Sequence, residues 1–123
     1  MRTLDRPSIL VVDDDCSGCE VLATLLATRG FRVRAAKDGQ EALDLLQSGV
    51  RPDLLIIDLK LQKVSGPELL RYTHEDPELR CIPTIIVTGT AGPVAAMADE
   101  VFIKPVDIAR LLDSVKRLVG GPA

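Results

Sequence analysis

Residues 53–58 read DLLIID, four consecutive apolar residues with an aspartate on each side. A short, unbroken apolar run of this kind is typical of a β-strand that is buried on both faces. Two similar runs occur, SILVV at 8–12 and the run at 84–87 within PTIIVTG (83–89). Strands of this type belong to parallel sheets covered by helices, so we predict that the three runs are the central strands of such a sheet.

The segments between these strands carry apolar residues at helical spacing. The first has Val21, Leu22, Leu25 and Leu26 at such positions and is followed by Gly30, a helix stop. The predicted helices are 16–29, 38–49, 65–75 and 106–119. The remaining predicted strands are FRVRAA at 31–36, whose alternation places it nearer an edge, and EVFIKP at 100–105.

Strands and helices therefore alternate along the chain. Such alternation favours right-handed βαβ units and a parallel sheet with helices on both faces. One interval departs from the pattern, because residues 89–99, GTAGPVAAMAD, contain two glycines and a proline. We expect the helix in this interval, the fourth of an alternating fold, to be short or missing.

The composition limits the class of protein. The 123 residues predict a single domain over 1–123 with a core from about 8 to 119. Aromatic residues make up 2% of the chain, so the core must be aliphatic. The net charge of −3 comes without a basic stripe, so direct binding of nucleic acid is not expected. Without an 18-residue apolar run or a signal-peptide pattern, we expect a cytoplasmic protein that does not insert into membranes.

Polar residues follow the predicted strands at one edge of the sheet. Asp13–Asp15 follow the first strand, Asp58 closes the third, Thr88 closes the fourth and Lys104 follows the fifth. Open α/β sheets bind ligands at the carboxyl ends of their strands. A single strand-end aspartate is often only a turn or capping residue, and we expect that role for Asp15. The coincidence of the others indicates a functional site.

These residue types point to phosphoryl transfer. Carboxylates a few Å apart repel each other by about 4 kcal/mol per pair at an effective dielectric constant near 20. A hard divalent cation relieves this repulsion, and Mg²⁺ prefers oxygen ligands. Asp58 can act as a nucleophile and form an aspartyl phosphate. The Thr88 hydroxyl and the Lys104 ammonium can then take the remaining phosphoryl oxygens.

With these residues in place, the chain resembles a known family, the receiver domains of two-component response regulators. The resemblance runs from Ser8 to about Val119. The motifs that carry it are ILVVDDD (9–15), DGQEAL (38–43), PDLLIIDLKL (52–61) with Ser65-Gly66 downstream, IPTIIVTG (82–89) and FIKP (102–105). The resemblance implies a flavodoxin-like, doubly wound sheet of five parallel strands in the order 2-1-3-4-5.

The resemblance also implies a metal site and a phosphoacceptor. Asp58 would accept the phosphoryl group. Asp13 and Asp14 would be the acidic pair beside it, with Asp14 as the direct ligand of Mg²⁺, and Mn²⁺ as an acceptable substitute. The backbone carbonyl of Lys60 would complete the protein ligands of the metal.

By the same resemblance, Thr88 would be the switch hydroxyl and Lys104 the amine that contacts the phosphate. The donor would be a sensor histidine kinase or a phosphotransfer protein, and the downstream target is unknown. The domain would phosphorylate and dephosphorylate itself as part of a phosphorelay, without being a turnover enzyme. We expect a monomer or a weak homodimer.

The chain departs from the family in the part that reads out the signal. The family usually has an aromatic residue three positions before the lysine, and this chain has Val101. Phe102 is adjacent, but a shift of one residue turns it to the opposite face of the strand. The interval from Thr88 to Lys104 is also several residues shorter than usual. These departures leave open an alternative, an atypical pseudo-receiver that binds partner proteins without phosphorylation.

Other sequence features suggest other chemistries. Cys16 and Cys19 form a C-x-x-C at the start of a helix, as in thioredoxins, but the three preceding aspartates disfavour a thiolate. A zinc site would have to recruit Cys81 and His74 as further ligands. A haloacid dehalogenase-type phosphatase would need a second aspartate at the position of Lys60. We therefore take the two helix cysteines as packing residues.

Overall fold

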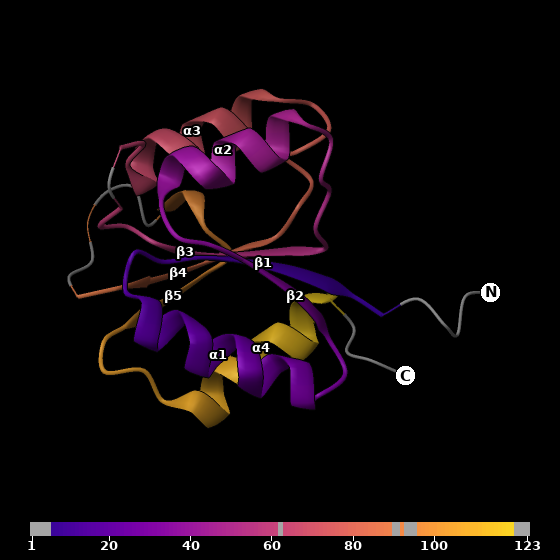
Figure 1. Cartoon of the computed structure of the whole chain (residues 1–123), viewed down its shortest axis with the longest axis vertical. Coiled ribbons are helices and arrows are strands. Elements are labelled where there is room, and N and C mark those ends of the chain that lie inside the picture. Colours follow the sequence, from indigo (N-terminus) through magenta and orange to yellow (C-terminus); the bar gives the residue numbers. More distant parts are fainter. Residues whose placement is uncertain (1–5, 62, 90–91, 93–95, 120–123) are drawn as a thin grey trace.

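The chain folds into an open sheet covered by helices. The structure, a computed structural model, describes residues 6–61, 63–89, 92 and 96–119. The five strands are all parallel and lie in the order β2-β1-β3-β4-β5. Helices α1 and α4 cover one face, and α2 and α3 cover the other (Figure 1). The elements are β1 Ser8–Val12, α1 Cys16–Thr28, β2 Arg32–Ala36, α2 Gly39–Gln47, β3 Leu54–Asp58, α3 Gly66–Glu75, β4 Thr84–Thr88, β5 Glu100–Ile103 and α4 Ile108–Val119. The predicted fold and strand order are confirmed.

The core consists of two aliphatic layers, one on each side of the sheet. Side chains of the central strands alternate between them, so Ile9 and Val11 join the layer under α1 and α4, while Leu10 and Val12 join the layer under α2 and α3. Every residue of β3 is buried. The unbroken apolar runs of the central strands thus reflect burial on both faces, as predicted.

The helices begin where the sequence offers a capping side chain. The Asp15 carboxylate accepts a hydrogen bond from the Gly18 N–H, which confirms its predicted capping role. Ser65 and Glu68 form a reciprocal capping box at the start of α3. Gly30 and Gly49, at φ 94° and 107°, end the first two helices in the left-handed conformation that glycine adopts without strain.

The connection between β4 and β5 is the irregular part of the alternation. Among the described residues, no α-helix lies between Thr88 and Glu100, in agreement with the expectation of a short or missing helix. Residues 90–91 and 93–95 of the predicted short helix lie outside the described residues. Val101 packs in the α2/α3 layer, whereas Phe102 packs in the α1/α4 layer. The aromatic ring therefore lies on the opposite face of β5 from Val101, as the strand periodicity predicts.

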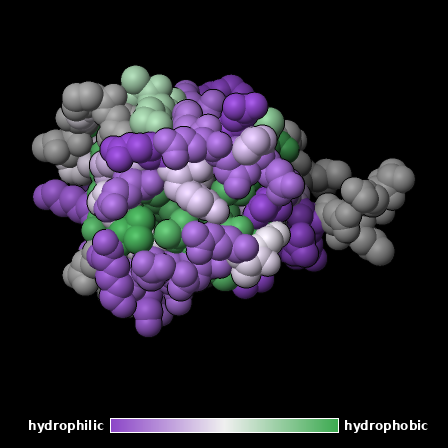
Figure 2. All heavy atoms as spheres, turned by 90° about the horizontal axis from the view of Figure 1, so that it is seen from above, coloured by the Kyte–Doolittle hydropathy of each residue, from purple (hydrophilic) through white to green (hydrophobic). Residues whose placement is uncertain are grey.

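The surface over α2 and α3 is mainly hydrophilic, with hydrophobic side chains visible between the polar ridges (Figure 2). This is the appearance of amphipathic helices that turn their apolar sides to the sheet. Within the part of the chain that the structure describes, no helix is both long enough and apolar enough to cross a membrane.

Candidate functional site

The polar residues that follow the strands meet at the carboxyl edge of the sheet. Asp13 directly follows β1, and its N–H bonds to the carbonyl of Ala36 at the end of β2. Asp58 is the last residue of β3, and Thr88 is the last residue of β4. Lys104 follows β5, and its N–H donates to the carbonyl of Thr88 at 2.8 Å. The parallel topology thus brings four separate segments to one rim.

Three carboxylates form a compact cluster on this rim. One oxygen from each of Asp13, Asp14 and Asp58 lies within 4.8 Å of the others. Asp58 is buried with 6% of its surface exposed, Asp13 is half-buried and Asp14 is exposed. Such a set of oxygen donors, graded from the interior to the solvent, fits a hard divalent cation that keeps part of its water shell.

Asp58 is held through both of its carboxylate oxygens. Oδ1 accepts the backbone N–H of Lys60 at 3.0 Å, and Oδ2 accepts the Lys104 ammonium at 2.9 Å. The hydrogen bond to Asp58 raises the pKa of Lys104 above its ordinary value, with the charge of Asp13 adding to the effect. The amine is therefore firmly protonated beside the buried carboxylate.

The pKa of the Asp13 carboxyl group is subject to opposing influences. Burial raises its pKa above the ordinary value, and the negative charge of Asp58 acts in the same direction. A hydrogen bond from the Asp15 N–H to Asp13 Oδ1 at 2.9 Å and the charge of Lys104 act in the opposite direction. The net effect is a carboxylate whose charged form is costly in the folded chain, which a cation would relieve.

Thr88 and Lys60, the other residues predicted for the site, also lie at the carboxyl edge of the sheet. Thr88 is buried at the end of β4, across from Ile103 in the β4–β5 ladder. Lys60 reaches the site through its backbone, which its hydrogen bond to Asp58 brings beside the cluster. Lys104 precedes a cis peptide bond to Pro105.

The zinc alternative finds no support in the described residues, and the side chain of Cys16, half of the C-x-x-C pair, lies outside them. Cys19 is a buried member of the α1/α4 core layer, and Cys81 is a free, exposed thiol. Among the described residues, the Asp13, Asp14 and Asp58 group is the one candidate metal cluster, and it contains neither cysteine nor histidine. A zinc site built from Cys81 and His74 is therefore not supported.

An apolar groove beside the acidic cluster was not foreseen. Its volume is about 470 Å³, and it runs from Asp13, Asp58 and Lys104 toward α1 and the start of α4. Val21 and Ile108 line it, and their surfaces are 60% and 39% exposed. Val21 is one of the apolar residues whose helical spacing predicted α1, but its exposed side chain lines the groove instead of joining either core layer. Because Val21 and Ile108 are far apart in the sequence, residue patterns alone do not reveal the groove.

Comparison with known proteins agrees with the fold. The family model "Response regulator receiver domain" matches residues 9–116. The polar-differentiation response regulator DivK of Brucella anthropi is 32% identical over 119 residues, which cover 92% of this chain and 96% of the relative. DivK of Brucella ovis is 31% identical with the same coverage.

Solved structures are similar over nearly the whole chain. The chemotaxis response regulator CheY4 of Vibrio cholerae has a TM-score of 0.83 and 26% identity, covering 93% of this chain and 98% of that one. The response regulator TrrA of Thermotoga maritima, solved in complex with Mg²⁺-BeF, has a TM-score of 0.81 and 29% identity, covering 91% and 98%. With a family model that spans most of its length and relatives above 30% identity, this chain belongs to the response regulator receiver domains of two-component systems.

Proposed function

We propose that this receiver domain, acting as one unit over residues 8–119, accepts a phosphoryl group on Asp58 in a reaction that requires Mg²⁺. The donor is the phosphohistidine of a histidine kinase or of a phosphotransfer protein. The observation that carries the proposal is the placement of a buried Asp58 between the Lys104 ammonium and the Asp13/Asp14 carboxylates. The intact cluster gives no support to the phosphorylation-independent alternative.

The cation is assigned to the carboxylates of Asp13, Asp14 and Asp58 and to the Lys60 carbonyl. The donor set is all oxygen, which suits Mg²⁺, and the solved Thermotoga maritima relative in complex with Mg²⁺-BeF favours the same metal. No comparable observation favours Mn²⁺. When bound, the ion would offset the negative charge that develops on the phosphoryl oxygens.

The chemistry of the transfer follows from the residues around Asp58. An Asp58 carboxylate oxygen attacks phosphorus, the bond from phosphorus to the donor imidazole nitrogen breaks, and the imidazole leaves as a neutral ring after taking up a proton. Lys104 moves from the carboxylate to a phosphoryl oxygen and keeps its positive charge at the reacting centre. The Lys60 N–H holds the carboxylate in place for the attack.

The structural change caused by phosphorylation would be transmitted to the surface through β4 and β5. Thr88 lies at the end of β4, and its carbonyl is bonded to the Lys104 N–H, so a shift at the phosphate is felt by both strands. Because Val101 stands in place of the usual aromatic residue, we expect the phosphorylation signal to be transmitted through the surface formed by β4, β5 and α4. Hydrolysis of the aspartyl phosphate returns the domain to its starting state, so it is a phosphoacceptor without catalytic turnover of a separate substrate. We expect a monomer or a weak homodimer.

The proposal is tested by incubating the protein with acetyl phosphate and Mg²⁺ and weighing the intact chain. We expect a mass increase of one phosphoryl group, its absence when a chelator removes Mg²⁺, and its absence in Asp58→Asn. Asp53→Asn is a matched control, because Asp53 lies at the other end of β3 and bonds to Ser8 N–H instead. An adduct that survives Asp58→Asn, or the lack of any adduct on the unchanged protein, would refute the proposal.

A further inference from the structure

The start of α2 contacts the loop that follows Asp58, although it contributes no side chain to the acidic cluster. This part of the DGQEAL motif holds Asp38, the N-cap of α2, and Gly39, its first residue. The loop between β3 and α3, described at residues 59–61 and 63–65, includes Lys60, whose N–H bonds to Asp58. The two segments are more than fifteen residues apart in the chain.

The closest contact is between two backbones. A Cβ placed on Gly39 would overlap the Val64 carbonyl, with the carbonyl carbon at 2.6 Å. Side chains essentially never come so close to backbone, so only glycine permits this approach. The base of the loop is closed in the same way, because a Cβ on Gly66 would lie 2.6 Å from the Leu59 Cα, and the Gly66 N–H bonds to the Leu59 carbonyl.

The second contact is an ion pair next to an unusual backbone conformation. Lys63 has φ 70°, and among the described residues it is the one non-glycine residue with positive φ. Its ammonium lies 3.5 Å from Asp38 Oδ2. Asp38 is itself fixed, since its Oδ1 accepts the Glu41 N–H at 2.8 Å, and this bond and the Lys63 charge hold the pKa of Asp38 below its usual value. The left-handed turn at Lys63 is therefore held from α2.

We propose that these contacts form a clamp, made of Asp38, Gly39, Lys63 and Val64, that fixes the loop after Asp58 and so places the Lys60 carbonyl for the cation. The clamp residues are positioning residues, because they act on the metal site through the loop backbone. This inference rests on the proposed function, since the cation is the one assigned there. It predicts that the start of α2 tunes the affinity for Mg²⁺ without contacting the ion.

The test compares two glycine substitutions that flank the same helix. Gly39→Ala would push the Val64 backbone away, while Gly49→Ala introduces strain at φ 107° but meets no atom within 4 Å. Both change one hydrogen to a methyl group at an end of α2. We expect Gly39→Ala to raise the Kd for Mg²⁺ about tenfold, as is typical when outer partners of a metal site are lost. Gly49→Ala should lower the melting temperature and leave the Kd unchanged.

A direct view of the loop comes from nuclear magnetic resonance. Lys60-Leu61 is the one Lys-Leu dipeptide in the sequence, so carbonyl-¹³C lysine combined with ¹⁵N leucine labels that single peptide bond. Its signal should move on addition of Mg²⁺ to the unchanged protein. Gly39→Ala should shift the signal before any cation is added, whereas Gly49→Ala should not.

A folded Gly39→Ala with an unmoved signal and an unchanged Kd would overturn the clamp, and so would an equal loss of affinity in Gly49→Ala. If Gly39→Ala does not fold, Asp38→Asn decides, because asparagine keeps the cap but removes the charge opposite Lys63. A Kd raised about twofold supports the clamp, on the scale of a solvated ion pair, and an unchanged Kd overturns it. An unchanged protein that binds no Mg²⁺ at all would instead refute the proposed function.

Discussion

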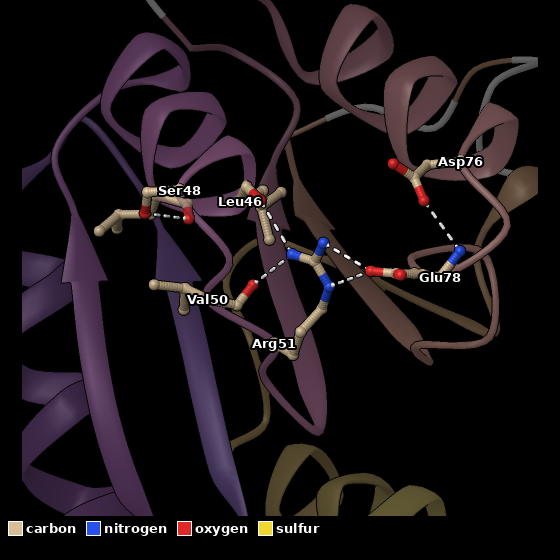
Figure 3. A network of polar contacts seen from close by, with 7 residues as sticks. Leu46, Ser48, Val50, Arg51, Asp76 and Glu78 are labelled. Carbon is tan, nitrogen blue, oxygen red and sulfur yellow. Dashed lines mark hydrogen bonds and ion pairs between the residues drawn. The ribbon is translucent and has the colours of Figure 1, made fainter.

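The two ends of the sheet each hold an ion pair between segments that are far apart in the sequence, but their charges are balanced differently. At the amino end, the Arg51 guanidinium donates to Glu78 Oε1 at 2.8 Å and 3.2 Å and to the carbonyls of Leu46 and Val50 at 2.8 Å and 3.0 Å (Figure 3). At the carboxyl end, Lys104 bonds to Asp58 within a cluster of three carboxylates. In the Arg51–Glu78 pair one cation meets one anion, whereas at the carboxyl end the Lys104 ammonium lies beside a cluster of three carboxylates.

The difference separates a structural contact from a functional one. The Glu78 side chain is 73% exposed, and an exposed pair contributes at most about 1 kcal/mol to stability. The Asp58 side chain is 7% exposed. Beside it, burial and the charge of Asp58 raise the pKa of Asp13, so the charged form of Asp13 is costly without a further cation. An arrangement that lowers stability in this way is expected where function requires it. The amino end holds two loops together, and the carboxyl end is prepared to bind a cation.

The largest effect is expected when Lys104 is replaced. Lys104→Met should slow phosphorylation by acetyl phosphate about 100-fold, because a charge aimed at the phosphoryl oxygens is lost. It should also cost about 1–2 kcal/mol of stability, less than a fully buried pair, because the Lys104 side chain is 41% exposed. Arg51→Met is the matched change at the amino end and should leave the rate unchanged. Similar rates for both variants would remove the distinction between the two ends.

The next effect is stabilisation by the cation. At a Mg²⁺ concentration about 100 times the Kd, the free energy of unfolding should rise by about 2.7 kcal/mol. Asp14→Asn should lose most of this gain, and Arg51→Met should keep it, as urea unfolding with and without Mg²⁺ would show. If Asp14→Asn were stabilised as much as the unchanged protein, the cation would bind somewhere else.

A smaller effect concerns pH, through the raised pKa of Asp13. The folded chain holds this proton more tightly than the unfolded chain, so ionisation of Asp13 lowers stability as the pH rises from about its ordinary value of 3.8 through the raised pKa. Asp13→Asn should therefore gain stability relative to the unchanged protein between acid and neutral pH in the presence of chelator. Urea unfolding of both proteins across this range measures the gain, and a difference that is constant with pH would contradict it.

The smallest effect is expected at the amino end. Arg51→Met should lower the free energy of unfolding by about 1 kcal/mol, through the lost pair with Glu78 and the lost bonds to two carbonyls. Part of this cost should disappear at high salt, because exposed charges are screened. A loss of several kcal/mol would show that the amino-end network is a main support of the fold.

Much of the fold could be predicted because its signals are local. The unbroken run of β3, the caps at Asp15 and Ser65 and the glycine stops each depend on a few neighbouring residues. The location of the site followed from topology, since parallel strands place Asp13, Asp58 and Lys104 at one edge. The roles of these residues in catalysis and metal binding stay predictions.

Other features could not be predicted because they depend on contacts between distant segments. The exposure of Val21 follows from the groove that α1 forms with the start of α4, and helical spacing alone does not reveal it. The positive φ of Lys63 and the close approach of Gly39 to Val64 require the loop and α2 to be placed together. Such information appears only when the layers are assembled.

The central claim is that Asp58, at the carboxyl end of the sheet, accepts the phosphoryl group. Locating the phosphoryl group in the chain tests this claim most directly. Borohydride reduces an aspartyl phosphate to homoserine, so the modified residue can be found by peptide mass spectrometry after reaction with acetyl phosphate and Mg²⁺. The account predicts homoserine at position 58 and no conversion at Asp13 or Asp14. Conversion at either of these two residues, or conversion at Asp58 that is equally efficient without Mg²⁺, would contradict it.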